Sequence, residues 1–317
     1  MGGVQLLADS PLRTHAGPAM AALAGYCVTT AVSATWVSFS FTGISGPALT
    51  FVTFVLAQAV YTARAGRGVK TAWRFAVAHR GQVLLLNVLT LASWLFMFMA
   101  LQRIEASVES AVYQGSVALV GFLVAGLVAG ERFSLAVRVG ALAAGAALVL
   151  LIAVRVVSTA DTPSANPSVG TGIVLALVAG TTGGFYIFCS SRLHRDTGVS
   201  ANTVLCSRFL LLLAVTGAFS AHEVLGLLAS DPVVIGRLLA LSVVFVVLPT
   251  FLLQYAIAHL PSVRVSAATP LVPVIALGAE YAVQPWGSAA APAIVVAASA
   301  ALIFTNTALA RGPRATT

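Results

Sequence analysis

The amino-acid sequence predicts an all-α membrane protein with ten transmembrane helices, arranged as two inverted five-helix repeats. Three observations carry this prediction. Hydrophobic residues make up 59% of the chain and charged residues only 8%, whereas soluble domains hold far more charge. Apolar runs recur along the whole chain, and their length is close to the ~20 residues that a helix needs to span a bilayer. The motif Thr-Gly-Ile-Ser at 42–45 also returns as Thr-Gly-Val-Ser at 197–200.

The first half of the chain provides five expected spans. The first run is too long for the core of a signal peptide, so we expect it to stay in the mature protein. The second begins at the break formed by Gly46-Pro47, and a basic loop separates it from the third. The fifth ends at a polar run that contains two prolines. The five spans are 20–41, 45–63, 81–102, 106–130 and 133–154.

The second half provides five more expected spans. Basic residues follow the sixth span, and Pro261 ends the eighth span. The break at 284–287 separates the ninth span from the tenth. These spans are 170–191, 201–221, 234–258, 265–286 and 287–310. The resulting organisation is a first repeat over 1–157, an extracytoplasmic linker over 158–169, and a second repeat with a cytoplasmic tail over 170–317.

The basic residues predict the orientation, because cytoplasmic loops are enriched in Lys and Arg. Most of them fall on the side that holds both termini, whereas Arg103, Arg155 and Arg237 fall on the other side. Both termini are therefore expected to be cytoplasmic, with Trp73 as an interfacial anchor. The net charge of +8 does not indicate a nucleic-acid partner, because the basic residues lie in short loops between apolar runs, where they determine the orientation in the membrane. All but one of the 17 basic residues are Arg, which favours a bacterial plasma membrane.

The repeated motif predicts the inversion. Because five is odd, a second copy of five spans enters the membrane from the opposite face, and the basic residues before the second motif agree with that placement. In the same register Gly25 meets Gly180 and Phe54 meets Phe209. Inverted repeats allow alternating access to a central site. The fifth and tenth spans carry small residues one turn apart, which permits close packing within one chain or in a homodimer.

Three segments resemble a known family. The segment ALQRIEASVESAVYQGSVALVGFLVAGLVAGERFS (100–134) resembles the fourth span and the following turn of the EamA-type repeat in the drug/metabolite transporter (DMT) superfamily. Residues 253–277 are similar to the same passage of the second repeat, and 207–215 to its Arg-Phe helix opening. Pro273 and Gly130-Glu131 match the family pattern. Thr53 and Val117 stand where the family has Arg and Pro, and the second Gly-Glu is replaced near residue 286.

The resemblance implies a ten-span fold with a central cavity, lined mainly by spans 1, 3, 4, 6, 8 and 9. It also implies export or exchange of small metabolites. It places Arg208 away from the cavity, so we expect Arg208 to be a structural charge that snorkels toward the cytoplasmic face.

Two intramembrane carboxylates are the costliest side chains, at about 2.5–3.5 kcal/mol each on insertion scales. Glu109 and Glu280 form either a proton- or cation-responsive pair that binds substrate amines, or two groups that snorkel or bond a neighbouring helix. Other polar and aromatic side chains are candidates for the cavity wall, against the alternative that each only packs helices. The candidate cavity residues are Trp36, Trp94, Phe98, Glu109, Tyr113, Gln114, Tyr186, Gln254, Tyr255, Thr269, Pro273 and Glu280.

These observations predict a secondary transporter, an exporter or exchanger of a small metabolite, amino-acid-like compound or drug, with protons or another coupling ion as a partner. A lipid flippase of the same fold is the alternative, and an intramembrane enzyme the less favoured one. HEVLG at 222–226 lacks the second His of a zinc protease, and no phosphate-binding loop occurs. The three cysteines have no paired spacing. We expect no catalytic residue, metal or cofactor.

Overall fold

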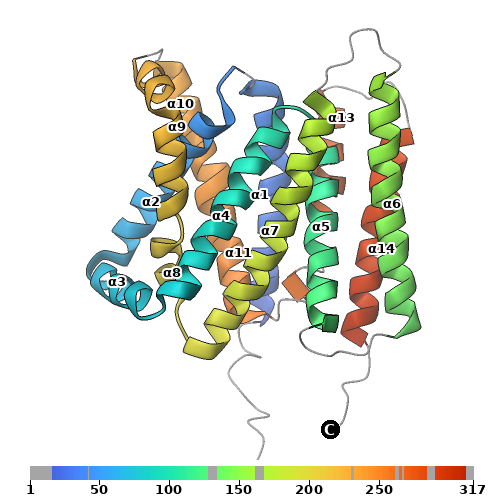
Figure 1. Cartoon of the computed structure of the whole chain (residues 1–317), viewed down its shortest axis with the longest axis horizontal. Coiled ribbons are helices and arrows are strands. Elements are labelled where there is room, and N and C mark those ends of the chain that lie inside the picture. Colours follow the sequence, from blue (N-terminus) through green and yellow to red (C-terminus); the bar gives the residue numbers. More distant parts are fainter. Residues whose placement is uncertain are drawn as a thin grey trace, which may run out of the picture.

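The computed structural model describes residues 16–41, 43–127, 134–160, 168–229, 232–260, 264–265, 268–283 and 290–311. Within these ranges the chain is helical and contains no strand. The helices stand side by side as one bundle (Figure 1). They are α1 (Ala16–Ser40), α2 (Gly46–Ala65), α3 (Val69–Ala78), α4 (Arg80–Leu101), α5 (Ala106–Leu127), α6 (Leu135–Ala160), α7 (Ser168–Thr197), α8 (Ala201–Ser207), α9 (Leu210–Leu228), α10 (Pro232–Leu241), α11 (Leu248–His259), α13 (Leu271–Val283) and α14 (Ala290–Arg311).

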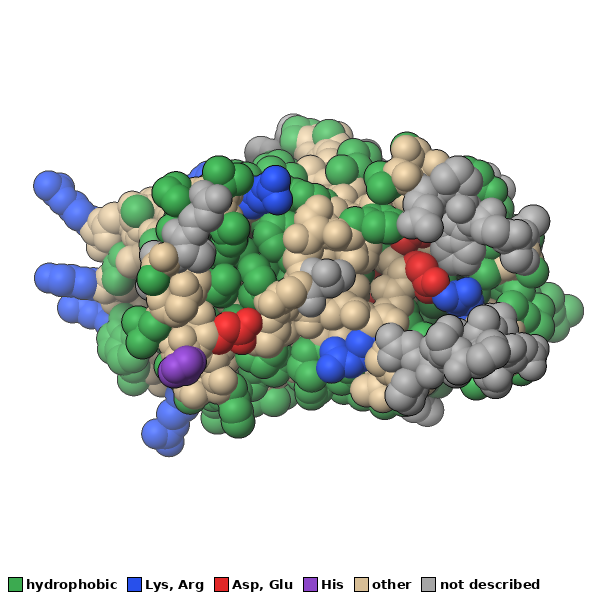
Figure 2. Space-filling view, turned by 90° about the horizontal axis from the view of Figure 1, so that it is seen from above, with side chains coloured by type: hydrophobic (Ala, Val, Ile, Leu, Met, Phe, Trp, Pro, Cys, Tyr) green, Lys and Arg blue, Asp and Glu red, His purple; other side chains and the backbone are tan. Residues whose placement is uncertain are grey.

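Eight helical stretches of the described chain are long and apolar enough to cross a membrane. Leu271–Val283 and Ala290–Thr305 are shorter apolar helices, and they occupy the positions of the ninth and tenth expected spans. Large apolar side chains point outward, including Leu142, 74% exposed, and Phe219, 81% exposed. Charged side chains are few among the hydrophobic ones in the view from above the bundle (Figure 2). The chain is therefore an all-α protein with the features of a multi-pass membrane protein.

Several expected features lie outside the described residues. They are Thr42, the Gly130-Glu131 pair, most of the expected linker, the break at Pro261 and the break at 284–287.

The second expected span continues further than the sequence indicated. A 3-10 turn at Gly66–Gly68 joins α2 to α3, and Gly66 has a φ of 50°, which favours glycine. The helix α3 buries only Ala72 and leaves Trp73 62% exposed. The basic stretch that the sequence predicted as a loop is thus a short helix at the end of the bundle. A helix can form here because only one side of it is buried. The segment is nevertheless too basic to continue the apolar run of the second span.

The repeated motif begins a helix in both halves. Ser45 is the N-cap of α2, and its hydroxyl accepts from the Ala48 backbone N–H at 3.3 Å. Ser200 is the N-cap of α8, and its hydroxyl accepts from the Thr203 N–H at 3.3 Å. Serine is favoured at this position because its side chain satisfies an amide that has no partner within the helix. The repeated serine therefore has the same structural role in each half.

Helices from the two halves of the chain interleave. Between the halves, α7 packs on α4 and α5, while α1 packs on α11 and α13. The pairs α2 with α9, α5 with α13, and α6 with α14 are also in contact. The α6 and α14 pair forms one edge of the bundle, and α2, α9 and α10 lie toward the other (Figure 1). The centre is therefore shared by both halves.

Close packing of α7 on α5 requires glycine. A Cβ at Gly180 would collide with the backbone carbonyl of Tyr113 and would lie 2.8 Å from Ser116 Cβ. Gly140 on α6 makes a similar approach to Thr305 on α14. The small residues of the fifth and tenth expected spans thus serve packing within the chain at this point.

Gly180→Val is expected to lower the melting temperature of the purified protein in detergent. The added side chain forces α7 away from α5, at a cost of about 1–3 kcal/mol or more. Gly170→Val is the matched control, because it lies in the same helix and a Cβ there meets nothing within 4 Å. Both changes introduce the same side chain, so the comparison isolates the effect of its surroundings. Equal melting temperatures for the two variants would contradict the close packing.

Candidate functional site

A cavity lies inside the bundle between helices of both halves. The volume that the centres of water molecules can occupy is about 30 Å³. The cavity therefore accommodates a few waters and not a metabolite. The walls combine polar groups with an apolar surface. They are formed by Tyr26, Thr30 and Ala34 of α1; Thr90, Ser93, Trp94 and Met97 of α4; Glu109, Ser110, Tyr113, Gln114 and Val117 of α5; Gly183, Tyr186 and Ile187 of α7; Arg208; Leu253 of α11; and Val272 of α13.

Five polar groups in this wall are buried and have no hydrogen-bond partner within the described part of the chain. They are Thr30 Oγ1, Thr90 Oγ1, Glu109 Oε1, Gln114 Oε1 and Arg208 Nε. Buried polar groups are normally bonded, because an unpaired donor or acceptor carries the full cost of desolvation. Unpartnered groups that converge on one cavity are typical of a binding site, where an occupant supplies the missing bonds.

Arg208 reaches the cavity because the helix breaks at this residue. The helix α8 ends at Ser207 and α9 begins at Leu210. Asn87 of α4 bridges the break: its Nδ2 donates to the Ser207 carbonyl at 2.8 Å, and its Oδ1 accepts from the Leu211 N–H at 3.1 Å. One backbone carbonyl and one backbone amide at the break thereby gain a partner. This bridge fixes the direction of the chain on either side of Arg208.

The expectation that Arg208 snorkels toward an aqueous face was wrong. The residue is only 2% exposed, and its Nη1 donates to the Tyr186 hydroxyl and to Gln254 Oε1, the latter at 2.9 Å. The guanidinium also lies 4.4 Å from the centre of the Tyr186 ring. Its position inside the bundle, next to these partners, makes the side chain part of the cavity wall. The signal that could have found it is the charge itself, because an intramembrane Arg marks a functional site by default.

A chain of hydrogen bonds continues from Arg208 along α7. The Tyr186 hydroxyl donates to Gln254 Oε1 at 2.5 Å. Gln254 Nε2 lies 3.0 Å from Ser190 Oγ and 2.6 Å from His194 Nε2. His194 Nδ1 lies 2.7 Å from the Val199 carbonyl, which can only accept, so the proton belongs on Nδ1 and Nε2 accepts from Gln254. One neutral tautomer therefore satisfies the whole chain.

Glu109 belongs to the cavity wall and has no cation beside it. The side chain is 2% exposed, and the hydroxyl of the adjacent Ser110 donates to its Oε2 at 3.4 Å. Within the described ranges, no Lys, Arg or His nitrogen lies within 4.0 Å of its oxygens. An acceptor-only carboxylate in this position can take a donor from an occupant of the cavity.

Glu280 has a different environment. It is also 2% exposed, but its Oε1 accepts from the backbone N–H of Ser107 at 2.9 Å. Ser107 lies in the first turn of α5, where amides lack partners within the helix and the helix dipole favours a negative group. The contact joins α13 to the start of α5. Glu280 is not among the described residues that line the cavity.

The other candidate residues divide into three sets. Trp94, Tyr113, Gln114 and Tyr186 line the cavity, and the Tyr113 hydroxyl lies 3.0 Å from Ser93 Oγ. Gln254 does not line the cavity itself, but it accepts hydrogen bonds from Arg208 and Tyr186, which do. The remaining residues lie elsewhere in the bundle: Trp36 against Phe41, Phe98 against Trp94 and Phe245, Tyr255 against Phe251 and His259, and Thr269 and Pro273 as buried residues. A role of any of these residues in substrate binding stays a prediction.

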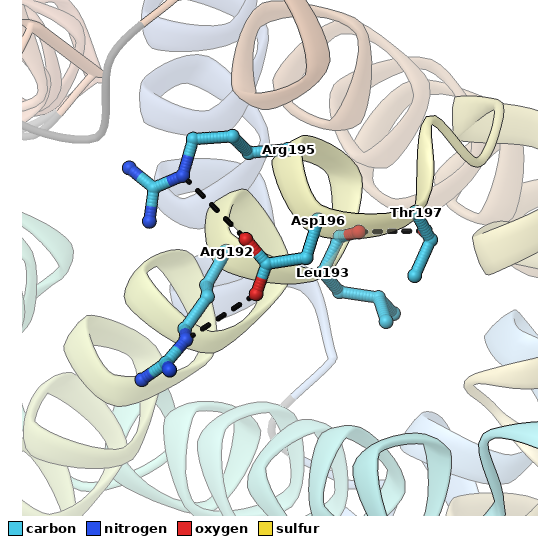
Figure 3. A network of polar contacts seen from close by, with 5 residues as sticks. All are labelled: Arg192, Leu193, Arg195, Asp196 and Thr197. Carbon is cyan, nitrogen blue, oxygen red and sulfur yellow. Dashed lines mark hydrogen bonds and ion pairs between the residues drawn. The ribbon is translucent and has the colours of Figure 1, made fainter. Parts of the chain in front are cut away.

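The end of α7 carries an exposed charge cluster. Asp196 lies 3.4 Å from Arg192 Nε and 3.7 Å from Arg195 Nε, while the Thr197 hydroxyl donates to the Leu193 carbonyl (Figure 3). These side chains are well exposed, so each pair contributes about 0–1 kcal/mol. The cluster marks an aqueous end of the helix and not a second site.

Comparisons with known proteins show the fold alone. No family model matches the chain, and no curated protein matches it. A solved structure described as "Crystal structure of protein" is similar over 92% of this chain and 98% of that chain, with a TM-score of 0.63 and 20% sequence identity. The helical bundle is therefore a fold already seen in another protein.

Proposed function

We propose that the chain is a secondary transporter that moves a small metabolite, amino-acid-like compound or drug through the central cavity by alternating access. The direction is export or exchange, and protons or another ion supply the coupling. The observation that carries this proposal is the cavity itself. It is enclosed by helices from both halves, and several of its buried polar groups have no partner within the described ranges. A receptor or scaffold has no need of an inverted repeat, which alternating access uses.

The packing supports an inverted-repeat transporter of ten spans, similar to the EamA-type members of the DMT superfamily. In this proposal α1, α4, α5 and α6 of the first half correspond, in this order, to α7, α11, α13 and α14 of the second. Under this correspondence, and with the two halves exchanged, the contact between α4 and α7 is equivalent to the contact between α11 and α1. The α5 and α7 contact likewise becomes that of α13 and α1, and the α6 and α14 contact is unchanged. Such an exchange lets the halves alternate in opening a shared centre. In this proposal α13 and α14 are the ninth and tenth spans.

The proposed setting is the plasma membrane of a bacterium, with both termini in the cytoplasm. The basic residues of α3 and of the end of α7 then face the cytoplasm, in line with the enrichment of Lys and Arg there. The transporter works without a metal, cofactor or nucleic acid and catalyses no chemical reaction. A homodimer is compatible with this arrangement, although the mechanism needs only one chain.

Gly183→Val is expected to abolish transport without unfolding the protein. Gly183 lines the cavity, and an added Cβ would meet the Tyr113 hydroxyl at 2.5 Å and Ser93 Oγ at 3.1 Å. The substitution places its side chain in the cavity wall, against Tyr113 and Ser93. Proteoliposomes of simple phospholipids would be loaded with a bacterial metabolite extract, and efflux would be followed by mass spectrometry. Gly170→Val is again the matched control.

The outcome separates the candidate functions. Saturable efflux through the wild type and the control, lost in Gly183→Val, supports transport through this cavity. Transfer of a labelled phospholipid between leaflets, without metabolite efflux, would identify a flippase instead. A new compound formed without a gradient would identify an enzyme. Equal efflux from Gly183→Val and the wild type would place the pathway elsewhere.

A further inference from the structure

The cavity holds two ionisable side chains of opposite sign, and neither has a counter-ion among the described residues. Arg208 and Glu109 are each 2% exposed. Among the described residues, no ion pair within 4.0 Å involves either of them. Arg208 Nε and Glu109 Oε1 also have no hydrogen-bond partner there. Burying an unpaired charge is costly, and a partner of opposite charge lowers that cost.

The partners that Arg208 already has do not neutralise it. Tyr186 and Gln254 offer neutral oxygens, and both contact the same Nη1 atom. The remaining guanidinium donors are suited to a planar carboxylate, which accepts two parallel hydrogen bonds. Glu109 is the complement, because an ionised carboxylate accepts hydrogen bonds only and an ammonium group donates three.

The rest of the wall is largely apolar or aromatic. Met97, Val117, Ile187, Leu253 and Val272 contribute aliphatic surface, and the wall also contains Trp94 and tyrosine rings. Arg208 and Glu109 are the only charged side chains among the described residues that form it. The cavity accommodates only a few waters in this conformation, so a ligand enters when the helices move apart, as alternating access requires. A ligand that then binds against this wall has an apolar body.

We propose that the substrates are zwitterions with an apolar body, in which Arg208 binds the carboxylate and Glu109 binds the ammonium group. This inference rests on the proposed transport function of the cavity. A ligand that carries only one of the two charges leaves the other side chain uncompensated. The pair of side chains therefore selects against simple amines and simple acids of the same shape. The match of charges, more than contact area, sets the substrate class.

The test compares isosteric ligands of the purified protein at pH 7. Leucine is measured against 4-methylpentanoate, which lacks the amine, and 3-methylbutylamine, which lacks the acid. A second set, 6-aminohexanoate with hexanoate and hexylamine, covers a wider separation of the charges. Saturable shifts in melting temperature give the affinities. We expect one zwitterion to bind at least about tenfold more tightly than both of its analogues.

The outcomes separate this inference from the transport proposal. If an amine or an acid binds as tightly as its zwitterion, or if neither zwitterion binds, the inference is overturned. If vesicles release only compounds that are not zwitterions, transport stands and the zwitterion assignment falls. If a zwitterion binds but no compound crosses the membrane, the binding site stands and transport falls.

Discussion

Replacing Arg208 with methionine abolishes saturable efflux while the melting temperature stays the same or rises. Methionine keeps most of the side-chain length and removes the charge. The cavity then loses the group that pairs with a carboxylate, and the loss of a desolvated charge-assisted bond costs about 2–5 kcal/mol of binding. Efflux at a fixed low substrate concentration should therefore fall by about 30-fold or more.

Stability responds differently because the buried charge of Arg208 has no counter-ion in the part of the chain that the structure describes. Replacing buried ionic groups by apolar residues of similar volume is often neutral or stabilising. The hydrogen bond from Tyr186 to Gln254 remains after the substitution, so the Gln254 carbonyl keeps a donor. The break between α8 and α9 is held by Asn87 and does not depend on Arg208. The fold therefore retains its local support.

The measurement pairs efflux from proteoliposomes with thermal unfolding in detergent. Arg237→Met is the control, because Arg237 is exposed on α10 and the same change there should leave efflux intact. A purely structural role for Arg208 would appear as a lower melting temperature, with the residual efflux proportional to the folded fraction. That result would remove Arg208 from the site.

The helical architecture could be predicted from local properties of the sequence. Composition and runs of apolar residues are enough to identify helices that can cross a membrane, because each such helix satisfies its own backbone. The sequence did not predict that the helix continues into α3. The segment is basic and buries only one side, so it lacks the apolar run that indicates a span. The count of ten spans stays a prediction, because α13 is a shorter apolar helix and its sequence neighbours lie outside the described residues.

The environment of single polar residues depends on contacts that the sequence does not reveal. Arg208 faces the cavity because Asn87, 120 residues before Ser207 in the chain, bridges the break beside it. Apolar periodicity contains no signal for such a bridge. Trp94, Tyr113 and Gln114 were predicted from their chemistry and do line the cavity, whereas Tyr255 had the same chemistry and packs against His259. Chemistry alone therefore selected candidates but could not rank them.

The two carboxylates illustrate the same limit and lead to a paired prediction. Glu109 and Glu280 looked equivalent in the sequence, as acidic residues within apolar runs. In the structure Glu280 accepts from Ser107, 173 residues away, while Glu109 lines the cavity with an unpartnered oxygen. Substituting glutamine preserves volume in both cases and removes the charge. Binding should change at one site and stability at the other.

Glu109→Gln is expected to leave the melting temperature within a few degrees of the wild type and to remove the preference for the ammonium group. Leucine and 4-methylpentanoate should then bind with similar affinity, because a neutral amide no longer favours the cation. Glu280→Gln should retain the preference but lower stability by about 1–3 kcal/mol, since the Ser107 amide loses a charged acceptor. Affinities and unfolding of the two variants, measured side by side, separate recognition from support. The reverse pattern would assign recognition to Glu280, and the part of the substrate proposal that rests on Glu109 would fail.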